Sequence, residues 1–158
     1  MNKYFNKLRS YIDANYLEPD SSVRYSLRKD NSSNNIKHYV EKELQKSMNF
    51  SNLLAKFMID KGFYSKPELY KKACIDRRHF HKLTNDKVIP KKETVLALAI
   101  ALQLNLTESE RLMESVGYAF SPCKITDLVI RFFLDNGIYD RFEIDEALVE
   151  LGEAPLTG

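Results

Sequence analysis

From residue 47 onward, apolar residues recur every three or four positions, in short segments that are separated by polar turns. This spacing is typical of helices with one apolar face. The first segment predicts a helix over 48–61, because Phe50 and Leu54 belong to a continuous apolar stripe. Gly62 follows where a left-handed residue commonly ends a helix.

Two shorter helices are predicted next, and each opens with a residue suited to capping. The hydroxyl of Ser65 can accept a hydrogen bond from the backbone N–H of Glu68, whose carboxylate can reach back. Pro67 lies in the first turn, where a helix needs no donor. Asp76 is a good N-cap for the next helix, expected over about 77–84.

The run 94–102 is apolar nearly all round, so we expect a buried helix there. Thr107 and Glu110 indicate a capping box that opens a further helix, which ends near Gly117. The residues expected to form one buried cluster are Leu54, Leu69, Phe80, Leu83, Leu96 and Ile100.

Two final helices are predicted, one around 125–135 closed by Gly137 and one opened by Asp140 and Glu143. They carry more apolar side chains than two isolated helices can bury. We therefore expect either self-association through this pair or packing of the pair against the preceding helices. The side chains are Leu128, Val129, Phe132, Phe133, Ile144, Leu148 and Leu151.

The first 46 residues have a weaker pattern. Apolar spacing favours helices over 1–16 and 36–46, whereas 18–35 is rich in Ser, Asn and Asp and predicts a loop. An edge strand over 23–28 is compatible with the alternation there. Because strand signals are otherwise nearly absent, the expected fold class is all-α.

Charge is divided unevenly along the chain. The net charge is only +2, but residues 1–103 hold 20 basic and 11 acidic side chains, whereas 104–158 hold 4 basic and 11 acidic ones. A polyanion is therefore an expected partner of the first part only.

The helix over 77–84 is the candidate functional element, because its side chains divide by helical rotation. At 100° per residue, Phe80 and Leu83 fall on one side, whereas Arg78, His81 and Lys82 fall opposite. The apolar side can dock on a core while the basic side faces outward. A short exposed basic helix of this kind fits the major groove of DNA.

The segment Ser65 to Leu98 resembles the Xre/Cro helix-turn-helix family. The matching residues are Glu68-Leu69, Ile75 in the turn, Phe80 and Leu83, Pro90 after a short loop, and the run from Leu96 to Leu104. The resemblance implies a five-helix, lambda-repressor-like domain over about 47–119. An N-terminal extension (1–46) and an acidic C-terminal helical pair (120–158) would flank this domain.

The resemblance also implies roles for individual residues. Base contacts would come from the opening of the third helix, and phosphate contacts from the start of the second helix and the loop after the third. Helical rotation also places His81 on the outer face of this helix. The expected base contacts are therefore Arg77, Arg78, His81 and Lys82. The expected phosphate contacts are Lys66, Asn85, Lys87, Lys91 and Lys92.

Two residues depart from the family's pattern. Cys74 stands where the family usually has a turn glycine, and Tyr70 replaces a small residue where the two helices approach most closely. A larger side chain at a close contact forces repacking, so both substitutions bear on the angle between the helices.

Other chemistry has little support in the sequence. Cys74 and Cys123 lie far apart and form no CxxC pair, which argues against a disulfide framework or zinc site. His79 and His81 point in different directions from one helix, so no metal is expected. No Gly-rich phosphate loop or catalytic motif stands out. We therefore expect a non-enzyme without cofactors.

The expected function is that of a bacterial or phage DNA-binding transcription regulator, which binds double-stranded DNA as a homodimer. The alternative is an interaction or inhibitor protein, phage- or defence-related, whose acidic C-terminal helices bind a protein partner. With no apolar stretch of membrane-spanning length and a polar start, the expected location is the cytoplasm, without a membrane partner.

Overall fold

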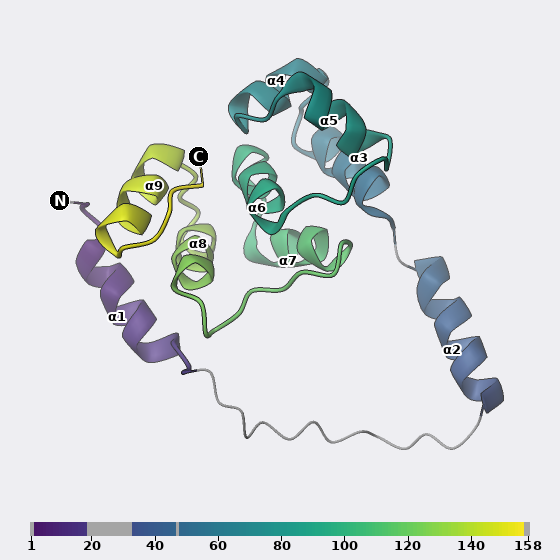
Figure 1. Cartoon of the computed structure of the whole chain (residues 1–158), viewed down its shortest axis with the longest axis horizontal. Helices are drawn as coiled ribbons and strands as arrows, with labels where there is room; N and C mark the ends of the chain where they lie inside the picture. The colour runs from purple at the N-terminus through teal and green to yellow at the C-terminus, as the bar shows by residue number, and fades with distance from the viewer. Residues whose placement is uncertain (1, 19–32, 47, 157–158) are drawn as a thin grey trace.

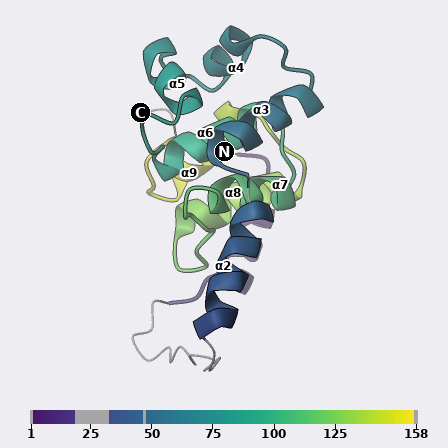
Figure 2. The same cartoon turned by 90° about the vertical axis from the view of Figure 1, so that its right-hand side faces the viewer.

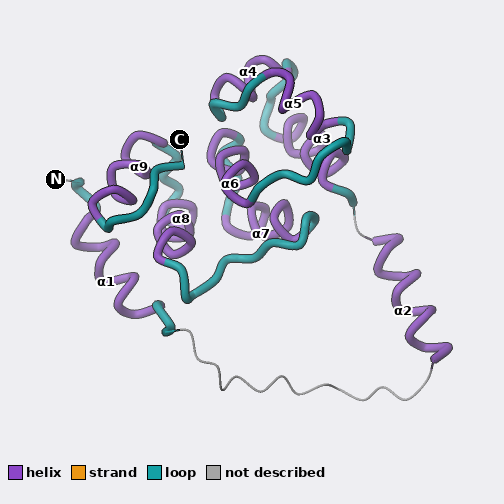
Figure 3. Tube along the Cα trace, in the orientation of Figure 1, coloured by secondary structure: helices purple, strands orange, loops and turns teal. Residues whose placement is uncertain are grey.

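The computed structural model describes residues 2–18, 33–46 and 48–156, and throughout these ranges the ordered elements are helices without any strand (Figures 1 and 3). The all-α prediction is therefore confirmed for the described residues. The expected edge strand over 23–28, and most of the expected loop, lie outside them.

Five helices occupy the region in which the sequence predicts five. They are α3 (Phe50–Asp60), α4 (Lys66–Lys72), α5 (Arg77–Thr84), α6 (Lys92–Ala101) and α7 (Leu106–Glu114). The six residues predicted to form one cluster are all buried in a common core. Helix α6 is buried along almost its whole length, as an all-round apolar helix must be.

The predicted helix caps are confirmed in part. Asp76 and Asp140 each accept hydrogen bonds from two backbone N–H groups of the helices that they open. The prediction for Ser65 is wrong, because its hydroxyl makes no capping bond although the helix begins there. The exposed first turn of that helix can be satisfied by water instead.

The capping box of α7 lies two residues before its predicted position. Asn105, not Thr107, is the N-cap, and its side chain accepts a hydrogen bond from Glu108 N at 2.8 Å. Asn105 N in turn donates a hydrogen bond to Glu108 Oε1 at 3.2 Å. The helix begins at Leu106, so Thr107 already lies inside the first turn.

The last two helices, α8 (Ile125–Asp135) and α9 (Arg141–Glu150), pack with the N-terminal helix α1 (Phe5–Asn15) on one side of the molecule (Figure 1). Tyr4 and Tyr11 meet Phe133 and Phe132 edge-on, with ring centroids 5.9 and 5.5 Å apart. Phe142 and Val149 of α9 are exposed, whereas the seven side chains that predicted self-association are buried within the chain, apart from the half-buried Leu151. Their excess is therefore not a reason for self-association.

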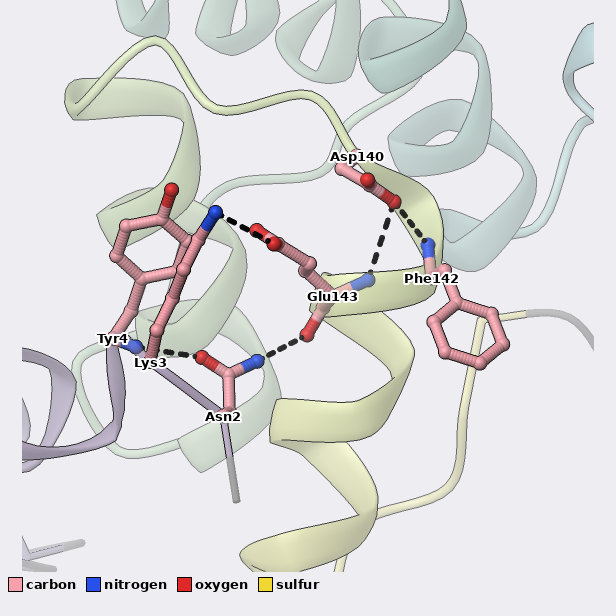
Figure 4. Close-up of polar contacts among 6 residues, drawn as sticks. All are labelled: Asn2, Lys3, Tyr4, Asp140, Phe142 and Glu143. Atoms are coloured by element: carbon pink, nitrogen blue, oxygen red, sulfur yellow. Dashed lines mark hydrogen bonds and ion pairs between the residues drawn. The ribbon is translucent and has the colours of Figure 1, made fainter.

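Polar contacts fasten the N-terminus to α9 (Figure 4). Asn2 Nδ2 donates to the Glu143 carbonyl at 2.9 Å, and Asn2 N donates to Glu150 Oε1 at 3.1 Å. Lys3 Nζ forms an ion pair with Glu143 at 3.1 Å, and this hydrogen-bonded partner raises the pKa of Lys3. The start of the expected N-terminal extension therefore packs with the C-terminal helices.

Helix α2 (Ser33–Lys46) extends away from the other helices in both views (Figures 1 and 2). Every side chain described on it, from residue 35 to residue 43, is exposed. The apolar spacing predicted this helix correctly from residue 36 onward. It gave no information about whether another element covers the apolar face.

Candidate nucleic-acid interface

The turn between α4 and α5 is built from backbone hydrogen bonds that end α4. Ile75 N donates to the Tyr70 carbonyl at 2.8 Å, and Cys74 N donates to the Lys71 carbonyl at 3.1 Å. This pair of bonds is the Schellman arrangement, which needs a left-handed residue after the C-cap. Cys74 supplies it with a φ of 55°, so it adopts the conformation expected of a turn glycine.

Asp76 then opens α5 and fixes its direction. Its carboxylate accepts hydrogen bonds from Arg78 N at 3.0 Å and from His79 N at 3.4 Å. Phe80 and Leu83 turn inward and are buried. Tyr70 of α4 packs against the Phe80 ring, with centroids 5.6 Å apart, so the large residue at the close approach becomes part of the contact.

The opposite face of α5 is open to solvent. All four residues expected to contact bases are exposed, namely Arg77, Arg78, His81 and Lys82. The division of the helix into an inner apolar side and an outer basic side therefore agrees with the rotation predicted from the sequence. The exposure of these side chains is a geometric requirement for groove entry.

A groove of about 880 Å³ runs between α4 and α5 and brings most of these residues together. Five of its lining side chains are cationic, and none of the described residues that line it is a carboxylate. A concentration of like charge of this kind attracts anions. The lining residues are Lys66, Pro67, Tyr70, Arg77, Arg78, Phe80, His81, Lys82 and Lys87.

Sequence reasoning did not include Pro67 and Tyr70 in the site, although they form part of the groove wall. In the sequence, Pro67 indicates only the first turn of a helix, and Tyr70 indicates a large residue where two helices approach closely. Because Pro67 and Tyr70 are three residues apart, they lie on the same face of a helix, and this spacing could have placed them together in the site.

The structure does not gather all the expected phosphate contacts. Lys66 and Lys87 line the groove, whereas Lys91 is exposed outside it. Asn85 Nδ2 donates to the His81 carbonyl at 2.7 Å, so part of this amide is used within α5.

Lys92 is occupied by an ion pair within the chain. Its ammonium group meets Asp127 Oδ2 at 2.5 Å, and the two side chains are only 18% and 3% exposed. Asp127 also accepts a hydrogen bond from Ser121 N at 2.7 Å. Because breaking this pair would leave a buried carboxylate uncompensated, Lys92 is poorly suited to a phosphate contact.

The loop after α5 is attached at both of its ends. Asp86 accepts a hydrogen bond from Ser51 Oγ of α3 at 2.7 Å, and Tyr118 OH donates to the Pro90 carbonyl at 2.9 Å. Lys87 follows Asp86 directly. Its backbone is therefore fixed beside the groove by neighbouring residues.

The described residues hold no group of three His, Cys, Asp or Glu side chains arranged for a metal ion. None of the described helices is long and apolar enough to cross a membrane.

No protein-family model, curated protein or solved structure matches the chain.

Proposed function

We propose that the chain is a sequence-specific DNA-binding protein of the helix-turn-helix kind, which regulates transcription by placing α5 in the major groove. The groove formed by α4 and α5 carries this proposal, because five cations and no described carboxylate surround the outward face of a short helix. Binding to DNA requires such a surface, since neutralising phosphates releases counterions and provides most of the affinity.

Different residues of the groove are suited to contacting bases and to contacting phosphates. Arg78, His81 and Lys82 project from the outer face of α5, where they can reach base edges, and Arg77 flanks them. An arginine or lysine in this position pairs best with the O6 and N7 of guanine.

Residues at the edges of the groove would hold the phosphate backbone. Lys66 lies at the start of α4 and Lys87 in the loop after α5, so the two lie on either side of the recognition helix along the sequence. Lys91 extends this set, whereas Asn85 is left out because its only side-chain donor, Nδ2, already bonds to the His81 carbonyl. Lys92 is left out because it pairs with Asp127.

We propose that two copies bind together on one DNA site. A single small domain buries little DNA surface, and two half-sites increase both affinity and specificity. The contact between copies would not involve the apolar faces of α8 and α9 that are buried in this chain.

Selection of bound duplexes from a random-sequence pool tests the proposed function. A specific DNA-binding protein enriches one motif over successive rounds, and a paired protein enriches a motif with twofold symmetry. A pool that stays random after selection would contradict sequence-specific binding. A control selection with Arg78→Ala/Lys82→Ala should lose the motif.

Helix α2 supports a second candidate function, that of a protein-interaction module. Ile36, Tyr39 and Val40 lie on one face of the helix and are 55%, 64% and 46% exposed. An apolar helix face in solvent is a common anchor for a partner groove. Loss of a host partner from pull-downs with Tyr39→Ser, but not with the exposed Lys42→Ser, would support this reading.

A further inference from the structure

The turn before α5 and the loop after it are each held by a side chain that follows α7 in the sequence. On the side before α5, Arg141 Nη1 donates a hydrogen bond to the Ala73 carbonyl at 2.6 Å. On the side after it, Tyr118 OH bonds the Pro90 carbonyl. Arg141 opens α9, so the C-terminal helices reach the turn that directs the recognition helix.

The chemistry of the Arg141 contact suits the end of a helix. Ala73 is the C-cap of α4, and carbonyls at such an end find no N–H partner within the helix. The Ala73 side chain and backbone are only 1% exposed, so water has little access to the residue. A guanidinium there also meets the negative end of the helix dipole.

This hydrogen bond connects α9 to the turn. A cleft of about 150 Å³ separates the surrounding side chains, and Ala73, Cys74, Ile75 and Arg141 all line it. Arg141 Nε is moreover buried without a hydrogen-bond partner. Arg141 therefore contacts the turn through Nη1 and not through Nε.

We propose that Arg141 is a positioning residue for DNA recognition. By fixing the Ala73 carbonyl, it sets the α4–α5 turn and therefore the direction in which α5 presents Arg78 and Lys82. Arg141 does not line the groove, so it acts through the turn and not by touching DNA. This role rests on the proposed DNA-binding function.

Hydrogen exchange tests the structural half of the proposal without DNA. In Arg141→Met, which keeps the aliphatic stem, the amides of Cys74 and Ile75 should exchange about tenfold faster, as expected when a charged hydrogen bond is lost. Arg141→Lys keeps a charged donor and should restore most of the protection. Arg111→Met, at an exposed arginine of α7, is the control and should leave these amides unchanged.

Duplex binding tests the functional half, at a temperature well below the melting transition of each variant. Arg141→Met should bind the selected duplex about tenfold more weakly but bind a random duplex almost as well as wild type, because the phosphate contacts remain. Equal affinities of variant and wild type, or unchanged exchange at Cys74 and Ile75, would overturn the role of Arg141 alone. A wild-type protein that binds no duplex would overturn the proposed function and this role together.

Discussion

Cys74 adopts the left-handed backbone conformation that the turn requires, and it does so at a cost in conformational strain. Its φ of 55° lies in the left-handed region, where a side chain with a Cβ is strained and glycine is not. The sequence placed Cys74 in a short turn between two helices, and the structure has a left-handed residue there, because turn geometry is local. The sequence could not show whether the backbone or the helix angle would adapt to the cysteine.

Replacing Cys74 with glycine should therefore stabilise the protein. We expect Cys74→Gly to raise the free energy of unfolding by up to about 1 kcal/mol, since relief of strain exceeds the added entropy of the unfolded chain. Urea denaturation measures this. Cys74→Ala removes the same thiol but keeps the Cβ, so it should bring no such gain, and equal stabilities of the two variants would refute the explanation.

A substitution of Leu96 tests the predicted core at the scale of a single residue. It lies on α6, is 1% exposed, and belongs to the cluster that the apolar spacing identified. Leu96→Ala should lower the free energy of unfolding by about 2–5 kcal/mol, because it removes buried methyl groups and leaves a cavity. A loss below about 0.5 kcal/mol in denaturant titration would be incompatible with this position in the core.

At the scale of the helices, local patterns located the elements, although the caps predicted at Ser65 and Thr107 were wrong, and long-range partners were not visible. Asp76 and the inward turn of Phe80 followed from residues within one or two turns. The pairing of Lys92 with Asp127 joins residues 35 positions apart, and the bond from Asn2 to Glu143 spans 141 positions. Such contacts leave no periodic trace in a single sequence, so the ion pair of Lys92 could not be predicted from it.

If α5 reads bases as proposed, α5 and the loop that follows it should respond differently to mutation. Arg78→Ala should cost about 1–3 kcal/mol on the preferred duplex and relax the preference at one base pair. Lys87→Ala should weaken binding to all duplexes alike and lower the slope of log affinity against log salt by about one unit. Fluorescence anisotropy across a salt series separates the two effects, and identical behaviour of both variants would contradict the assigned roles.

At the scale of the whole molecule, the N-terminal helix completes the C-terminal pair and hides its apolar side chains. Asn2 is central to this closure, because it is 5% exposed and bonds both to Glu143 and to Glu150. The apolar excess of α8 and α9 was correctly seen in the sequence. The element that covers it could not be identified, since α1 lies at the other end of the chain.

Asn2→Ala should loosen this closure and lower the free energy of unfolding by about 1–3 kcal/mol, as expected when buried hydrogen-bonding groups lose their partner. Thermal unfolding followed by circular dichroism measures the change. Asn6→Ala, at an exposed position of α1, should change stability by less than about 0.5 kcal/mol. Similar losses for both variants would indicate that Asn2 has no special part in holding α1.

The most direct test of the central claim measures affinity for duplex DNA against salt concentration, starting near 50 mM. We expect salt-sensitive binding by the wild-type protein, which Arg78→Ala/Lys82→Ala greatly weakens. Lys7→Ala/Arg9→Ala removes the same charge from exposed positions on α1 and should leave binding nearly intact. Wild-type protein that binds no duplex, or equal binding by the wild-type protein and both double variants, would contradict the claim that α5 is a DNA-recognition helix.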